Sequence, residues 1–177
     1  MKFHSPSHVP VRRPGVPRKW RSGALAIAFA ALASAANAQD GRDVIYGCLD
    51  NIGLSTTWAQ CVNAMFSPCA GEELGTEAHA ACLNGLYSTW FDGLESEVAA
   101  TMQKLPQYGQ EELTGILSAW YGFASTKCSE IAAGREGSAA QSAELGCQIS
   151  ETALLSNELR RCRAGRSQEA YCAGVSD

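Results

Sequence analysis

The chain has 177 residues with eight cysteines, 14 Lys or Arg and 18 Asp or Glu, for a formal charge of −4. Residues 1–38 hold six of the cationic residues and none of the acidic ones, so removing that segment leaves a formal charge of −10. Such acidity argues against nucleic acid as a partner, because phosphate binding depends on clustered cations; it either favours a cationic partner or only maintains solubility.

Residues 1–38 have the organisation of a cleavable export signal. A basic stretch at residues 12–21 precedes an apolar run at residues 23–36, and Ala36-Asn37-Ala38 is a small-residue cleavage site. Cleavage is therefore predicted before Gln39. The apolar run is shorter than the roughly 20 residues of a membrane span. A periplasmic or secreted protein without a membrane anchor is expected after cleavage.

Residues 39–177 are long enough for a single domain, and their apolar periodicity predicts helices almost throughout. Residues 43–65 are predicted to form two short helical turns, broken by Gly53 and by Ser67-Pro68. No alternating strand pattern of useful length occurs. The expected fold class is a small all-α domain stapled by disulfides.

An antiparallel helical hairpin and a third helix are predicted next. Between Glu77 and Gln103, apolar residues recur in steps of three and four, with Thr76 as N-cap and Pro106 after the run. Residues 109–133 repeat this pattern after a short link. Residues 134–138 are read as a C-capping glycine, a turn and a new N-cap, and a third helix then extends to about residue 162. Two residues of the hairpin are expected in the core: Trp90 and Trp120.

All eight cysteines follow the predicted cleavage site, which is typical of a disulfide framework formed in an oxidising compartment. They are Cys48, Cys61, Cys69, Cys82, Cys128, Cys147, Cys162 and Cys172. Cys82 and Cys128 fall at similar heights in the predicted hairpin, so a Cys82–Cys128 bridge is the first expectation. Cys147 and Leu154 lie opposite Leu145 on the third helix, which favours cover by the N-terminal segment and a Cys69–Cys147 bridge. Local bridges Cys48–Cys61 and Cys162–Cys172 complete this ranked set.

The residues after the predicted cleavage site show little sign of catalytic chemistry. Their one histidine, His79, lies three residues before Cys82, but no CxxC accompanies it. A packed or capping histidine is therefore expected in preference to a zinc ligand or a base. An even number of cysteines predicts that every thiol is paired, which leaves no thiolate nucleophile. No catalytic residue, metal site or cofactor is predicted.

Several spaced motifs in the second half of the chain form a recognisable pattern. They are Trp120 eight residues before Cys128, the turn at residues 134–138, Cys147, and Thr152 five residues later, with Leu159 beyond. Upstream, Cys69 and Cys82 precede Trp90 and Leu94. This order resembles the LprI-like lysozyme-inhibitor domain family over about residues 48–162. The chain departs from the family at several polar positions: Phe91 stands where Asp is usual, Glu95 where Asn is usual, and Ala124-Ser125 where Arg-Asp is common.

The resemblance implies a protein inhibitor of lysozyme that acts by binding and is not an enzyme. Lysozymes are commonly cationic with an acidic catalytic cleft, so an acidic binder would gain association rate while a loop blocks the cleft. The candidate loop is Arg135, Glu136, Gly137 and Ser138, with Arg135 meeting a catalytic carboxylate; the alternative is an ordinary helix connection. The main rival function is a periplasmic interaction or envelope-stress module without a lysozyme target, and a third is a peptidoglycan enzyme using one glutamate.

Overall fold

The computed structural model describes residues 41–173 and residue 175, and the predicted export signal lies outside them. Residues 41–50 are helical and are called the N-terminal helical segment below. The elements that follow are α2 (Trp58–Phe66), the 3₁₀ helix η1 (Ser67–Cys69), α3 (Glu77–Met102), α4 (Gln107–Ala132), α5 (Gly137–Arg163) and the 3₁₀ helix η2 (Ala170–Cys172). The described residues contain one isolated β-bridge and no strand, which confirms the all-α class.

The ends of the long helices lie close to the predicted positions. Thr76 caps α3, because its Oγ1 accepts a hydrogen bond from the His79 amide at 3.2 Å. Pro106 follows α3 and is the N-cap residue of α4. Gly134 ends α4 with a φ of 81°, a left-handed conformation that favours glycine. The Ser138 side chain does not cap α5, which already begins at Gly137.

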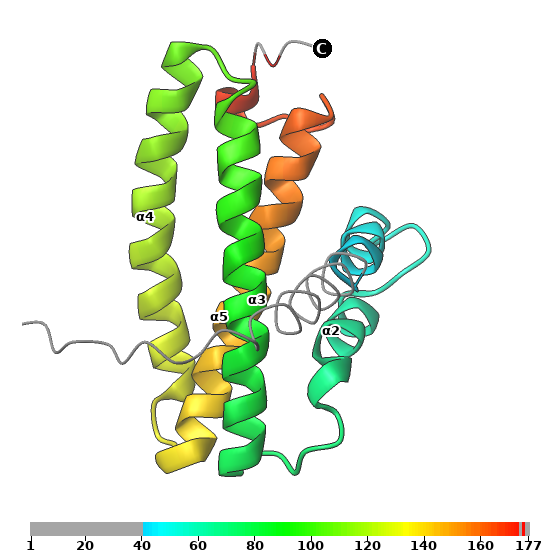
Figure 1. The fold of residues 1–177 in the computed structure, drawn as a ribbon, viewed down its shortest axis with the longest axis vertical. Coiled ribbons are helices and arrows are strands. Elements are labelled where there is room, and N and C mark those ends of the chain that lie inside the picture. Colours follow the sequence, from blue (N-terminus) through cyan, green and yellow to red (C-terminus); the bar gives the residue numbers. More distant parts are fainter. Residues whose placement is uncertain (1–40, 174, 176–177) are drawn as a thin grey trace, which may run out of the picture. The chain divides into compact units, whose positions relative to one another are not determined.

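The three long helices form the frame of the domain. Figure 1 shows α3 and α4 running antiparallel, with α5 beside them. The predicted antiparallel arrangement of these two helices is therefore confirmed. However, α3 and α4 pack mainly on α5 and only slightly on each other. The main packing partner of both α3 and α4 is therefore α5, and not the other helix of the hairpin.

Two apolar clusters fill the space between these elements. The first joins the N-terminal helical segment, α2 and η1 to α3 and α5, and includes Ile45, Met65, Leu83, Trp90 and Ile149. The second joins α3, α4, α5 and η2, and includes Leu94, Leu113, Leu159 and Tyr171. Trp90 is buried as expected, whereas Trp120 is only partly buried against the second cluster.

All eight cysteines are paired in the structure, but two of the four predicted pairings are wrong. Cys48–Cys61 and Cys162–Cys172 are confirmed. The other two bridges are Cys69–Cys82 and Cys128–Cys147, in place of the predicted Cys82–Cys128 and Cys69–Cys147. The physical reason is that Cys82 faces η1 and Cys128 faces α5, so neither points across the hairpin.

The cover on the second side of α5 also differs from the prediction. Cys147 bonds to α4, so α4 covers this side in place of the N-terminal segment. Leu154, which is predicted to lie on this covered side together with Cys147, is 41% exposed. The N-terminal helical segment instead packs in the first cluster, with Leu145 and Ile149.

Four disulfides are typical of proteins that fold in an oxidising, extracytoplasmic environment. Among the described residues, none of the helices combines the length and the apolar character that crossing a membrane requires.

Replacing glycine by alanine within α4 is expected to stabilise the domain at two positions and not at a third. A Cβ at Gly115 or Gly122 would meet open space, so each substitution should raise the free energy of unfolding by about 0.5–1 kcal/mol. A Cβ at Gly109 would lie 3.0 Å from the Tyr171 carbonyl oxygen. Urea unfolding of the three variants checks this, and a Gly109→Ala variant as stable as the others would contradict the packing of η2 on α4.

Candidate functional site

The predicted contact loop is the connection between α4 and α5. Arg135 and Glu136 are exposed there, between Gly134 and Gly137, which have positive φ angles of 81° and 56°. The Arg135 guanidinium donates a hydrogen bond to the Ile131 carbonyl at the end of α4. A cation is favourable at this helix end, and its remaining N–H groups can meet a partner.

This connection is held firmly from both sides. The Cys128–Cys147 disulfide joins α4 to α5 near the connection. Ser138 Oγ donates to the Gly75 carbonyl oxygen at 2.6 Å, which ties the start of α5 to the loop before α3. Gly137 and Ser138 therefore serve the geometry of the connection, and Arg135 and Glu136 are its accessible side chains.

A second surface feature is an aromatic cluster, defined here as Tyr87, Phe91, Trp120 and Tyr121. Neighbouring ring centroids are 5.8 Å apart for Tyr87 and Phe91, 6.2 Å for Phe91 and Tyr121, and 5.1 Å for Trp120 and Tyr121. Burial raises the pKa values of both tyrosines above the ordinary value of 10.0. Such half-exposed rings supply large contact area at low entropic cost.

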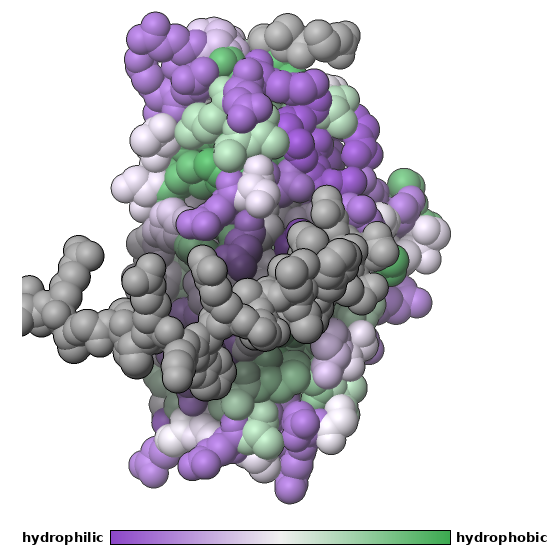
Figure 2. Space-filling view, in the orientation of Figure 1, coloured by the Kyte–Doolittle hydropathy of each residue, from purple (hydrophilic) through white to green (hydrophobic). Residues whose placement is uncertain are grey.

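The aromatic cluster lies where α3, α4 and α5 meet at the surface. A pocket of about 210 Å³ opens beside it, lined by three of its rings together with Gln148 and Thr152 of α5. Figure 2 shows hydrophobic residues in the upper and lower parts of the face that carries α3 and α4, with hydrophilic residues around them. This face therefore offers both apolar and polar contacts.

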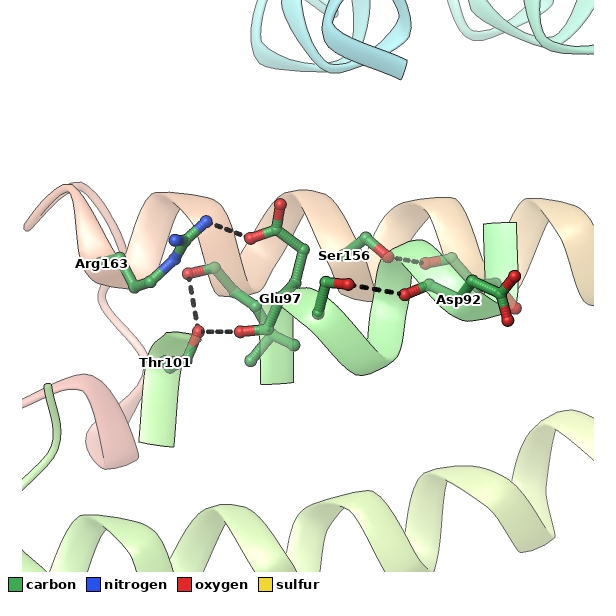
Figure 3. A network of polar contacts seen from close by, with 8 residues as sticks. Asp92, Glu97, Thr101, Ser156 and Arg163 are labelled. Carbon is green, nitrogen blue, oxygen red and sulfur yellow. Dashed lines mark hydrogen bonds and ion pairs between the residues drawn. The ribbon is translucent and has the colours of Figure 1, made fainter. Parts of the chain in front are cut away.

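A polar cluster joins α3 to the end of α5. In Figure 3 the Arg163 guanidinium points toward the Glu97 carboxylate, and the two form an ion pair. Thr101 Oγ1 donates to the Glu97 carbonyl oxygen at 2.7 Å and contacts the Leu159 carbonyl oxygen at 3.5 Å. Arg160 lies over the Tyr46 ring, 4.4 Å from its centroid, in a cation–π contact.

Charge is unevenly distributed around this polar cluster. Burial raises the pKa of Glu97 above 4.5, while Arg163, Arg160 and Arg42 act in the opposite direction and Asp43 adds to the increase. Three arginines and one aspartate thus act on Glu97, in a domain that is acidic as a whole. The Nη1 atom of Arg160 and the Nε atom of Arg163 are buried and have no hydrogen-bond acceptor among the described residues.

His79 connects α3 to α5. Its Nδ1 lies 3.1 Å from Ser142 Oγ, and its side chain is partly buried. This confirms the packed histidine expected from the sequence. His79 and Ser138 both contribute to the attachment of the start of α5 to the start of α3.

Sequence reasoning missed the aromatic cluster and the polar cluster, because each combines residues from distant segments. Apolar periodicity assigns Tyr87 and Trp120 to helix stripes, but it does not show that α3 and α4 leave these rings partly open. The sequence signal for the polar cluster was the run Arg160-Arg161-Cys162-Arg163 in the last turn of α5. Cations are favoured there by the helix dipole.

Comparison of the chain with protein-family models, with curated proteins and with solved structures finds no match.

Proposed function

We propose that the protein acts outside the cytoplasm, after removal of residues 1–38, as a lysozyme-inhibitor-like protein that works by protein–protein contact. Three features support this proposal: the resemblance to the LprI-like family, the four disulfides, and the accessible Arg135 and Glu136 on a firmly held connection. The third of these is the observation that carries it. A loop that is already held in one conformation loses little entropy on binding.

Electrostatics would assist the encounter with a cationic lysozyme. After removal of residues 1–38 the chain has a formal charge of −10, which attracts a cationic partner over several ångströms at low salt. The local positive charge of Arg135 would then face the acidic catalytic cleft, while Glu136 meets cationic groups at its rim. Binding should therefore weaken as the salt concentration rises.

Replacing Arg135 by alanine is expected to weaken lysozyme inhibition about tenfold or more, because arginines at the centre of an interface often dominate binding. Glu136→Ala should have a smaller effect in the same direction. The measurement is a cell-wall clearing assay with several lysozyme types at two salt concentrations, using oxidised protein exported from the full-length chain.

Two variants serve as charge-matched controls for this assay. Lys104 and Glu112 are exposed, and they lie at or near the connection between α3 and α4. Lys104→Ala and Glu112→Ala should inhibit as well as the wild type. If the Arg135→Ala and Glu136→Ala variants inhibit as well as the wild type, this loop is removed from the proposal. If folded wild-type protein inhibits no lysozyme, the lysozyme target is refuted.

The aromatic cluster favours a second candidate function, an interaction module for a different extracytoplasmic protein. Tyr121 is half exposed, and aromatic residues are enriched at the centres of protein interfaces. The clearing assay separates the two functions, because a module of this kind would leave lysozyme activity unchanged.

A further inference from the structure

A cavity of about 560 Å³ lies between the N-terminal helical segment, α2, η1 and α3. Met65, Leu86 and Trp90 contribute to its apolar lining, and Val44 lies at its rim, 68% exposed. Arg42 is the charged residue among the described lining residues. The volume falls within the range of about 300–1,000 Å³ that is usual for small-molecule sites.

The walls of this cavity are fixed by covalent bonds and by the core. The Cys48–Cys61 disulfide joins the N-terminal helical segment to α2, and Cys69–Cys82 joins η1 to α3. Trp90 is buried and packs edge to face on Tyr46, with ring centroids 5.7 Å apart. A cavity with such fixed walls binds an apolar molecule without a large ordering cost.

Arg42 is held at the cavity by two specific features of α3. Its Nη1 donates a hydrogen bond to the Thr89 carbonyl oxygen at 2.9 Å. Its guanidinium also packs where residue 93 has no side chain, since a Cβ on Gly93 would lie 2.9 Å from Nη1. A guanidinium has five N–H donors in a fixed arrangement, so others remain for an oxyanion.

Arg42 is one of several charged residues that act on Glu97. Arg42, Arg160 and Arg163 all act on Glu97, and Asp43 is the other carboxylate close to this group. Arg163 already pairs with Glu97. Of these three arginines, Arg42 is the one that lines the cavity.

The predicted cleavage site determines how much of the chain itself could fill the cavity. Cleavage before Gln39 leaves Gln39 and Asp40 ahead of Gly41, the first cavity residue. Two polar residues are too few to fill an apolar cavity of this size. Cleavage at this predicted site therefore favours a separate molecule as the occupant.

We propose that this cavity binds a single-chain amphiphile, with its hydrocarbon chain along Val44 and Leu86 and over the buried Trp90, and its anionic head group on Arg42. Burial of each CH₂ group strengthens binding about fourfold. The Arg42 guanidinium selects for a carboxylate or phosphate head. This site is separate from the α4–α5 connection and does not depend on the proposed function.

Trp90 provides a direct readout of binding. Oxidised protein exported from the full-length chain, with Trp58→Phe and Trp120→Phe, retains Trp90 as its tryptophan after cleavage. Titration with a long-chain fatty acid brominated on its chain, below its micelle concentration, is expected to quench Trp90 fluorescence in a saturable manner. The same titration with the corresponding brominated alcohol measures the contribution of the head group.

Two variants test the two parts of the site. Arg42→Gln should weaken binding of the fatty acid about tenfold and leave binding of the alcohol nearly unchanged. Ala64→Phe introduces a ring at the cavity lining and should weaken binding of both. Arg161→Gln and Ala59→Phe are matched controls, because they make the same two changes at positions that do not line the cavity. Thermal unfolding by circular dichroism confirms that each variant is folded.

The outcomes decide the proposal clearly. An absence of saturable quenching overturns it, and so does binding that neither Arg42→Gln nor Ala64→Phe weakens. A brominated alkyl phosphate distinguishes the sources of the ligand. Tighter binding of the phosphate supports a phospholipid-derived amphiphile, and tighter binding of the carboxylate supports a free fatty acid.

Discussion

Reduction of all four disulfides is expected to unfold the domain at room temperature. The bridges close chain segments of 13, 13, 19 and 10 residues, and each contributes about 3 kcal/mol by the chain-entropy relation. These segments follow one another without overlap, so their contributions add to roughly 12 kcal/mol. A domain of this size is typically stable by only about 5–15 kcal/mol in total.

The measurement is far-ultraviolet circular dichroism of protein that has been reduced and then alkylated. Loss of the helical signal, or of its cooperative thermal transition, is the expected result. Replacement of Cys128 and Cys147 together by alanine should cost only about 3 kcal/mol and leave a folded protein. A reduced and alkylated chain that still unfolds cooperatively would show that the apolar clusters suffice, and that the bridges act mainly on local geometry.

The outcome for the disulfides shows what helical periodicity can and cannot predict. The positions of the long helices follow from apolar spacing, Thr76, Pro106 and Gly134, because these signals are local in the sequence. Periodicity also placed Cys82 and Cys128 at the edges of their stripes. It could not show that η1 and α5 lie at those edges, since that depends on how α5 packs between the two arms.

The candidate sites also differ in whether the sequence could predict them. The connection at residues 134–138 could be predicted, because turn residues between two helices are recognisable in the sequence. The cavity could not, since it combines Arg42, Met65 and Trp90 from three separate elements. Gly93 carried a weak signal, as a glycine within a long predicted helix, and its significance appears only where the Arg42 guanidinium packs against it.

Replacement of Ile149 by alanine is expected to lower the free energy of unfolding by about 2–5 kcal/mol. Ile149 is fully buried in the first cluster, where α5 meets the N-terminal helical segment and α3. The substitution removes buried apolar surface and leaves a cavity that the disulfide-linked neighbours cannot easily close. Urea unfolding of the oxidised protein, monitored by circular dichroism, measures the loss.

Leu154→Ala on the same helix is the matched control, because its sequence pattern also suggested a covered position. The side chain is 41% exposed, so the change should stay within about 0.5 kcal/mol of the wild type. A loss as large as that of Ile149→Ala would place Leu154 under a cover that the described residues do not provide. A small loss for both would mean that the N-terminal helical segment contributes little to stability. In that case the two disulfides of this region, Cys48–Cys61 and Cys69–Cys82, would hold the walls of the cavity without help from the core.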